Sequence, residues 1–219
     1  RDPADDGQPM SIAVRTKSLD VSIRGDQILD SIDLSVAAGE WLSIIGPNGA
    51  GKTTLFHIIT GELRADTGEI NYRGEDITSL PPYRVARKGI GRLFQDVRVF
   101  ENLTVFENVV SACYDHRVET PWFPFLGKKR WKALERELKE KSDYYIDYVG
   151  LMEMKDVPAS SLSYGQQKLL AIARLLAGGF SLLLLDEPTA GLNPVMIKKV
   201  LNILKRIVEE DQGKTIVLV

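Results

Sequence analysis

Apolar and polar residues alternate in the first third of the chain, and this pattern predicts β-strands. Residues 12–23 and 27–36 alternate in this way, and the turn at 24–26 between them favours a hairpin. The apolar run from Trp41 to Ile45 predicts a short buried strand. Three further elements are expected beyond it: a strand over 69–72, a short helix over 83–88 and a strand over 90–94.

The pattern changes in the middle of the chain, where residues 96–165 show no strong strand alternation. Apolar residues recur at helical spacing over 103–111 and again over 128–149, where the charged residues form the solvated face of a long amphipathic helix. We therefore expect 96–165 to be a helical subdomain inserted into an α/β core. The core would then consist of residues 10–95 and 166–219.

Helix and strand signals alternate again in the last third. A helical run over 166–177 precedes a continuous apolar run over 181–185, which is typical of a strand buried on both faces. Asn193 and Pro194 favour a helix start, with a capping side chain before proline at the first helical position, and this helix is expected to reach Glu210. A last strand is expected over 215–219. The alternation of strands and helices predicts an α/β fold.

Composition narrows the class of protein. The 219 residues suffice for one large domain, and no apolar run approaches the roughly 18 residues of a membrane span. The net charge of −2 argues against a broad nucleic-acid-binding surface, which requires a basic excess. The single cysteine, Cys113, cannot form an internal disulfide, which fits a reducing cytosol. Residues 1–9 are polar and are expected to form a disordered tail.

The segment from Gly46 to Thr53 fits G-x-x-x-x-G-K-[ST], the loop that wraps the phosphates of a nucleotide (the P-loop). Its glycines permit a tight turn that directs backbone N–H groups at one anion, and the predicted helix after it adds the positive end of its dipole. Lys52 is expected to reach the outer phosphates, and the Thr53 hydroxyl to bind Mg²⁺. The predicted nucleotide-binding residues are Asn48, Gly49, Ala50, Gly51, Lys52, Thr53 and Thr54.

An acidic pair, Asp186 and Glu187, ends the apolar run of the last third. In a parallel sheet the carboxyl end of such a strand lies beside the P-loop. We expect Asp186 to hold Mg²⁺ through water and Glu187 to polarise the water that attacks the γ-phosphate. The two side chains leave the strand on opposite sides, so their roles should differ. The alternative is a strand that merely ends at an acidic turn, and the P-loop argues against it.

A third signal is the segment from Leu162 to Gln166. Ser163 is typical of a helix N-cap and Gly165 permits close backbone approach, so this helix N-terminus is a second candidate anion site. Taken alone, the segment indicates only the start of a helix.

These three motifs and Gln95 together resemble the ATPases of ABC transporters in order and separation, across essentially the whole chain. The resemblance implies a RecA-like P-loop core with an N-terminal antiparallel β-subdomain and an inserted α-helical subdomain. It implies ATP and Mg²⁺ as cofactors. Lys52, Gln95 and Glu187 would act in hydrolysis, and Thr53, Gln95 and Asp186 would hold the metal.

The resemblance also implies partners. Two ATPase subunits would sandwich two ATP molecules head to tail, and the signature residues of one subunit would face the nucleotide of the other. These residues are Ser163, Tyr164, Gly165 and Gln166. The dimer would be attached to transmembrane permease subunits on the cytoplasmic side of the cell membrane, and indirectly served by an extracytoplasmic solute-binding protein.

The chain departs from the family pattern at several points. Tyr164 replaces the usual second glycine of the signature, and Asn193 replaces the usual aspartate of the loop after the acidic pair. The histidine expected just after the last strand is missing, because the sequence stops at Val219. We therefore expect a truncated C-terminal end and, with it, impaired hydrolysis.

Within the family, the stretches 74–82, 94–100 and 190–194, with Tyr164, look like the ATPases of branched-chain amino acid and urea importers. Lipopolysaccharide-export ATPases share part of this pattern, and a soluble non-transport ABC ATPase or a small-molecule P-loop kinase are further alternatives. The resemblance places 95–102 against a coupling helix of the membrane subunit. Apolar candidates for that contact, each of which has the alternative of packing inside the helical subdomain, are Val97, Val99, Phe100, Trp122, Phe123 and Phe125.

Overall fold

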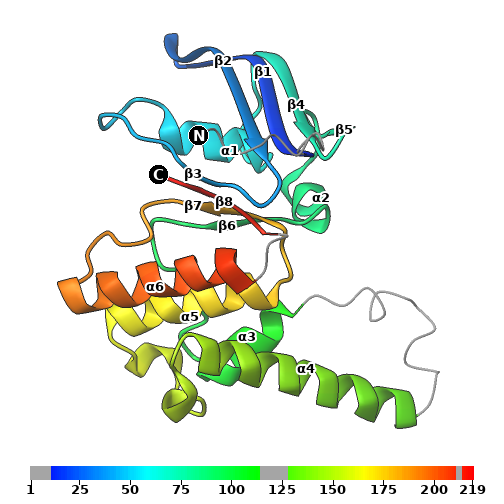
Figure 1. Cartoon of the computed structure of the whole chain (residues 1–219), viewed down its shortest axis with the longest axis vertical. Coiled ribbons are helices and arrows are strands. Elements are labelled where there is room, and N and C mark those ends of the chain that lie inside the picture. The colour runs from blue at the N-terminus through cyan, green and yellow to red at the C-terminus, as the bar shows by residue number, and fades with distance from the viewer. Residues whose placement is uncertain (1–10, 114–127, 211–213) are drawn as a thin grey trace, which may run out of the picture.

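The structure, a computed structural model, describes residues 11–113, 128–210 and 214–219. In these residues two four-stranded sheets are stacked on either side of the first helix, and the other long helices lie below the second sheet (Figure 1). This arrangement confirms the predicted α/β fold with an antiparallel sheet near the N-terminus. The predicted loop residues Trp122, Phe123 and Phe125 lie outside the described residues, and so does the segment 1–9, for which a disordered tail was predicted.

The first sheet is antiparallel and has the strand order β2-β1-β4-β5. Its strands are β1 (Ile12–Ile23), β2 (Asp26–Ala37), β4 (Thr67–Tyr72) and β5 (Glu75–Asp76). The hairpin of β1 and β2 turns at Arg24 and Gly25, as the alternation predicted, and its register shifts several times along the pair. Such irregularities increase the local twist of a sheet.

The second sheet is parallel and has the order β3-β8-β7-β6. Its strands are β3 (Trp41–Ser43), β6 (Ile90–Leu93), β7 (Leu182–Leu185) and β8 (Thr215–Leu218). Strand β7 lies between two neighbours and is buried along its whole length, as its continuous apolar sequence predicted.

Strand β3 corrects one prediction, because the run from Trp41 to Ile45 is not a buried strand. In the described part of the sheet β3 pairs with β8 alone and therefore has a neighbour on one side only. Trp41 and Leu42 are half-buried, and Ile45 is 93% exposed. The strand ends at Ser43 because the chain then turns into the P-loop.

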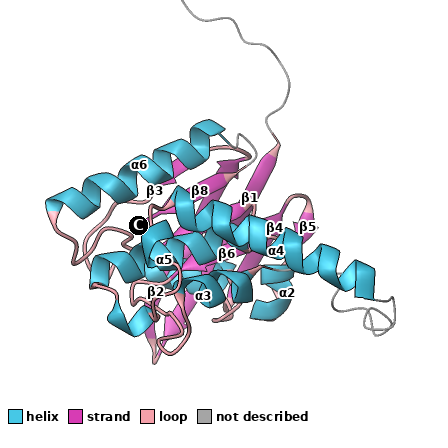
Figure 2. Ribbon diagram, turned by 90° about the horizontal axis from the view of Figure 1, so that it is seen from below, coloured by secondary structure: helices cyan, strands magenta, loops and turns pink. Residues whose placement is uncertain are grey.

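Six α-helices connect the strands or cover the parallel sheet in the described residues. They are α1 (Lys52–Ile59), α2 (Pro82–Arg87), α3 (Val105–Ala112), α4 (Lys128–Tyr148), α5 (Tyr164–Ala177) and α6 (Pro194–Glu210). Short 3-10 turns follow α4 at Met152–Met154 and Ala159–Ser161. Figure 2, seen from below, shows α3, α4 and α5 in front of the strands. Among the described helices, none combines the length and apolar character that a membrane crossing requires.

Side-chain caps fix where several helices begin. Ser163 and Gln166 form a reciprocal capping box at the start of α5, and Thr104 and Glu107 form another at the start of α3. Asn193 Oδ1 accepts the backbone N–H of Met196 at 2.9 Å, which confirms the predicted cap of α6. These caps satisfy N–H groups that the first helical turn leaves without partners.

Alternate residues of β7 belong to two different hydrophobic cores. Leu182 and Leu184 pack with α1 and the antiparallel sheet, whereas Leu183 and Leu185 pack with the helices on the opposite face. The period of two along a strand produces this division. The carboxyl end of β7 therefore lies where both cores meet, and the residues that follow it are held from two sides.

Candidate functional site

The P-loop joins β3 to α1 and turns sharply at two glycines. Gly49 and Gly51 have φ angles of 83° and 81°, in the left-handed region that favours glycine. Helix α1 begins at Lys52, so the N–H groups of its first residues have no partner within the helix and are available to an anion. Lys52 Nζ donates to the backbone carbonyls of Gly46 and Pro47, both at 2.9 Å, which holds the ammonium group at the loop.

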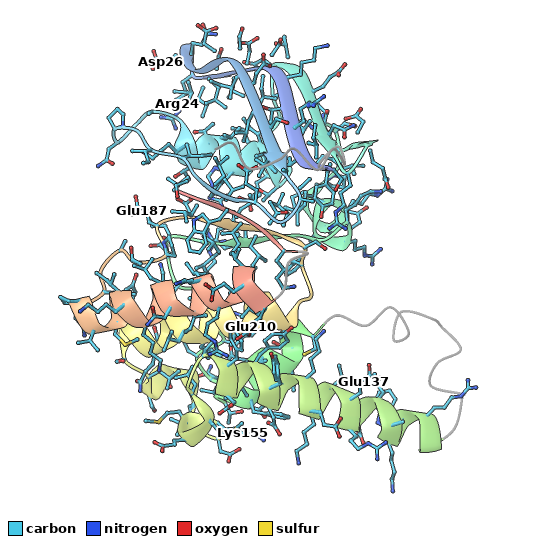
Figure 3. All side chains as sticks on the ribbon, viewed as in Figure 1. Arg24, Asp26, Glu137, Lys155, Glu187 and Glu210 are labelled. Atoms are coloured by element: carbon cyan, nitrogen blue, oxygen red, sulfur yellow. The ribbon has the colours of Figure 1, made fainter. Side chains whose placement is uncertain are left out.

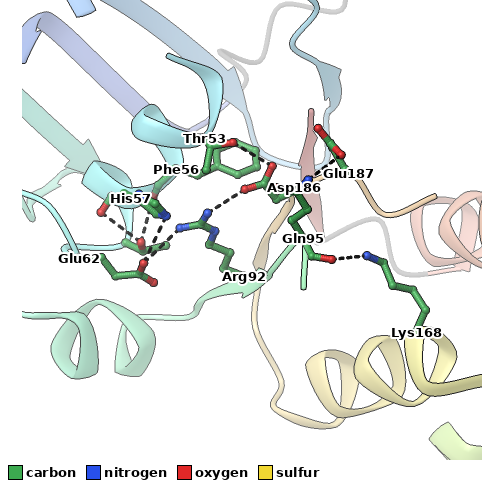
Figure 4. Close-up of polar contacts among 10 residues, drawn as sticks. Thr53, Phe56, His57, Glu62, Arg92, Gln95, Lys168, Asp186 and Glu187 are labelled. Carbon is green, nitrogen blue, oxygen red and sulfur yellow. Dashed lines mark hydrogen bonds and ion pairs between the residues drawn. The ribbon is translucent and has the colours of Figure 1, made fainter. Parts of the chain in front are cut away.

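Asp186 is held beside the P-loop, directly after β7. Its backbone N–H donates to the carbonyl of Leu93 on β6, and its side chain is 1% exposed. The Thr53 hydroxyl donates to Asp186 Oδ1 at 3.2 Å (Figure 4). The structure thus brings together Thr53 and Asp186, two of the three residues that were expected to hold the metal. The third, Gln95, contacts Glu187 instead.

The donor set at Thr53 and Asp186 fits Mg²⁺. Both offer hard oxygen atoms, and Mg²⁺ is usually held by one or two such ligands together with water and substrate phosphates. No cluster of three or more His, Cys, Asp or Glu residues suited to a metal occurs in the described part of the chain. The residues therefore suit an ion that arrives with a phosphate ligand, rather than one enclosed by protein alone.

Glu187 has a different set of partners from Asp186. Its carboxylate Oε2 accepts a hydrogen bond from Gln95 Nε2 at 3.1 Å, and its backbone N–H donates to the carbonyl of Val219. Its φ of 46° lies in the left-handed region, which is strained for a residue with a side chain. Glu187 lies at the end of the parallel sheet from which the P-loop emerges (Figure 3). Gln95 uses its amide N–H₂ for this hydrogen bond, so its amide oxygen takes no part in it.

Two buried cations flank the acidic pair, and the sequence interpretation missed both. Arg92 on β6 has a side chain that is 3% exposed, and its NH2 group donates to Asp186 Oδ2 at 2.8 Å. Lys168 on α5 is fully buried, and its Nζ donates to the backbone carbonyl of Gln95 at 2.9 Å. A charged residue within an otherwise apolar strand or helix face was the available signal in each case.

Burial lowers the pKa of Lys168, and the nearby carboxylates of Glu187 and Asp186 partly counteract this effect. Burial also lowers the pKa of His57, with Arg92 acting in the same direction and Glu62 in the opposite one. Both shifts come from a desolvated environment with concentrated charge, which is typical of functional sites.

The signature residues lie at the start of α5, and no described hydrogen bond joins them to the P-loop. Ser163 and Gln166 are engaged in the capping box. A methyl group added to Gly165 would lie 3.0 Å from Met196 Cε, so this glycine packs closely against the end of the methionine side chain. Tyr164 is 45% exposed, and a methyl group added to Gly191 would lie 3.2 Å from its ring. The signature and the loop around Gly191 thus touch within one chain.

The predicted coupling-helix residues separate into two groups. Val97 and Val99 are half-buried and pack against the helical core, so the internal-packing alternative holds for them. Phe100 is 52% exposed, and the guanidinium of Arg174 lies 4.7 Å from the centre of its ring.

The fold and the site together define a P-loop nucleotide-binding protein with an acidic pair beside the phosphate loop. Residues 29–190 match the ABC transporter family, and the chain belongs to that family of ATP-hydrolysing subunits.

Curated relatives of the chain are ATP-binding proteins of amino acid transport. The high-affinity branched-chain amino acid transport ATP-binding protein BraF of Pseudomonas aeruginosa is 40% identical over 76% of this chain and 65% of its own length. The probable branched-chain amino acid transport ATP-binding protein LivG of Archaeoglobus fulgidus is 36% identical over 90% of this chain and 74% of its own. The chain therefore spans about two thirds to three quarters of the length of these relatives.

Solved structures agree with this assignment. The ADP conformation of MJ1267, an ATP-binding cassette of an ABC transporter, has a TM-score of 0.77 at 30% identity and covers 94% of this chain and 80% of its own. A structure of cbiO1 from Clostridium perfringens, described as part of the ABC transporter complex cbiONQ, has a TM-score of 0.78 at 28% identity and covers 95% of this chain and 78% of its own.

Proposed function

We propose that the chain binds Mg²⁺-ATP at its P-loop and hydrolyses it to drive a membrane transporter. The observation that carries this proposal is the meeting of the loop and the acidic pair, in which Thr53 contacts Asp186 and Gln95 contacts Glu187. Phosphoryl transfer requires little covalent chemistry from a protein and depends on positioning and charge stabilisation. The described contacts provide such positioning.

Each residue of the site has a separate task in this proposal. Lys52 and the backbone N–H groups of the loop neutralise the phosphates, while Thr53 and Asp186 hold the metal. Bound Mg²⁺ would supply charge stabilisation at the phosphate oxygens. Glu187 would accept a proton from the attacking water, and Gln95 orients the Glu187 carboxylate. Gln95 would also help to hold the metal.

The proposed active form is a dimer of ATPase subunits, identical or related. The signature at the start of α5 makes no described hydrogen bond to the P-loop of its own chain, and its capping box positions a helix N-terminus that suits an anion supplied from elsewhere. A facing subunit would place its nucleotide there. Ser163 and Gly165 would then approach the γ-phosphate, and the exposed Tyr164 would contribute to the subunit contact.

A groove on the helical side supports docking of a permease subunit. Two adjoining hollows of about 290 and 440 Å³ share Ala112 and Phe180. Arg98 and Arg174 line the first hollow together with Asp96, and Tyr83 lines the second. Together with exposed Phe100, this surface combines aromatic and cationic groups that suit a short cytoplasmic helix with an acidic residue.

The relatives point to branched-chain amino acids, or a similar small polar solute, as the imported substrate. The ATPase would then lie at the inner face of the cell membrane, attached to permease subunits that receive solute from an extracytoplasmic binding protein. A lipopolysaccharide-type exporter and a soluble ABC ATPase are the competing functions.

Purification of the chain with its membrane partners, followed by reconstitution into liposomes, tests the function. We expect the complex to hydrolyse ATP and to accumulate labelled leucine when a binding protein is supplied. The Glu187→Gln variant should keep ATP binding but lose about 10²–10⁴-fold in hydrolysis, because the general base is absent. Undiminished hydrolysis by this variant would remove Glu187 from its role. Full activity with no membrane partner would favour the soluble alternative.

A further inference from the structure

Arg92 occupies the centre of a ring of contacts around the P-loop helix (Figure 4). One nitrogen of its guanidinium, NH2, donates to Asp186 Oδ2 at 2.8 Å, and the other, NH1, donates to Glu62 Oε2 at 3.3 Å. Thr53, at the start of α1, contacts the second oxygen of Asp186, and Glu62 lies three residues beyond the end of the same helix. The start of α1 therefore contacts Asp186 directly, and the segment after its end is connected to Asp186 through Arg92.

Two aromatic rings lie beside the guanidinium of Arg92. Its guanidinium carbon lies 4.9 Å from the ring centre of Phe94 and 5.9 Å from that of Phe56. The Nε–H has no hydrogen-bond partner among the described residues, although this atom is buried. The unsatisfied donor destabilises this arrangement, so the short contact with Asp186 is the main interaction that defines the position of the guanidinium.

The two oxygens of Asp186 are used by different partners. Oδ2 faces Arg92, and Oδ1 faces the Thr53 hydroxyl on the side of the P-loop. A carboxylate offers about four acceptor sites on its two oxygens, so Oδ1 keeps room for a further ligand. Arg92 prevents rotation of the carboxylate and thereby fixes which oxygen faces the phosphates. It also partly neutralises a carboxylate that has almost no exposure to water.

We propose that Arg92 is a positioning residue for the magnesium site: it orients Asp186 toward Thr53 and sets the affinity of the ATP-loaded site for Mg²⁺. This inference rests on the proposed nucleotide site and adds a determinant of metal affinity outside the P-loop and the acidic pair. Residues that orient metal ligands typically change metal affinity when they are replaced.

Equilibrium binding of labelled ATP, measured in EDTA and across a series of Mg²⁺ concentrations, tests this role. In the Arg92→Met variant we expect the affinity for metal-free ATP to stay within about twofold of the wild type. The Mg²⁺ concentration at which the change in ATP affinity is half complete should rise about tenfold. Met has a similar length but neither charge nor donors. Arg92→Lys keeps the charge but cannot bridge both carboxylates, and we expect an intermediate shift.

Glu62→Gln is the matched control, because it weakens the outer contact and leaves the Arg92–Asp186 pair intact. Its Mg²⁺ requirement should change by no more than about twofold, since Glu62 is partly exposed to solvent. Wild-type Mg²⁺ dependence in Arg92→Met would overturn the proposal, and so would an equal loss of ATP affinity with and without the metal. If Arg92→Met does not fold, a wild-type Mg²⁺ requirement in Arg92→Lys overturns it. Failure of the wild-type chain to bind ATP at all would instead refute the proposed function.

Discussion

Gly51 shows how one residue determines the shape of the P-loop. A methyl group added here would lie 2.6 Å from Cδ2 of Leu29 and 2.9 Å from the backbone oxygen of Ile28, and its φ is 81°. The antiparallel sheet thus presses directly against the loop that is proposed to hold phosphates. Gly49 has nearly the same φ, but no atom lies within 4 Å of an added methyl group.

This difference leads to a prediction about two alanine variants. Gly49→Ala should lose about 1 kcal/mol of unfolding free energy, because it introduces only the strain of the left-handed conformation. Gly51→Ala should lose about 3 kcal/mol, because overpacking against β2 adds to the same strain. Urea unfolding of both variants measures the difference. Equal stability of the two variants would show that the sheet does not constrain the loop.

The sequence predicts some single residues well and others poorly. The P-loop and the acidic pair are recognisable because their chemistry requires a fixed spacing within a short stretch. Arg92 and Lys168 could not be assigned in this way. Each contacts a residue far away in the sequence, which only the packing of two separate elements brings close. Nothing in the local pattern around Arg92 indicates that Asp186, which is 94 residues away, lies 2.8 Å from its guanidinium.

At the scale of elements, α5 connects the signature with the acidic pair. Its N-terminus carries Ser163, and one turn later Lys168 reaches the carbonyl of Gln95, whose side chain contacts Glu187. A displacement of α5 would therefore be transmitted to the proposed general base through two hydrogen bonds. Burial lowers the pKa of the same lysine. The buried ammonium group therefore reduces the stability of the fold at this position.

We predict that Lys168→Met separates activity from stability. Hydrolysis by the membrane complex should fall about tenfold or more, because Gln95 loses an anchor and small misplacements are costly in catalysis. The unfolding temperature should stay the same or rise, because Met fills the space with no desolvated charge. Lys199→Met is the matched control: it also removes a lysine contact to a backbone carbonyl, that of Gly150, but on the exposed side of α6. Parallel losses of activity and stability in Lys168→Met would contradict the coupling role.

Element boundaries were predictable where capping or strand burial dominates. Ser163 and Asn193 begin helices as their side chains indicated, and β7 is buried on both faces as its leucines indicated. The burial of β3 was not predictable, because a run of apolar residues does not reveal whether a strand has neighbours on one side or two. The exposure of Ile45 follows from that unpredicted position at the edge of the described sheet.

At the scale of the whole molecule, two hydrophobic cores meet along β7. One joins the antiparallel sheet to α1, and the other joins the long helices to the lower face of the parallel sheet. The proposed site lies at the end of this strand. A movement of the elements around either core would therefore change the distances between the P-loop, the acidic pair and Gln95. Such a position suits a protein that converts nucleotide binding into movement of its helical part. The limits of the helical subdomain, drawn at 96–165 from sequence, stay a prediction.

The central claim is that a nucleotide binds at the segment from Gly46 to Thr54. Calorimetric titration of the protein with ATP and Mg²⁺ tests it most directly, with Lys52→Ala measured beside the wild type. We expect about one ATP per chain in the wild type and an affinity at least about tenfold lower in the variant, since a charge-assisted contact to phosphate is lost. Equal affinities in the two proteins, or no binding by either, would contradict the account.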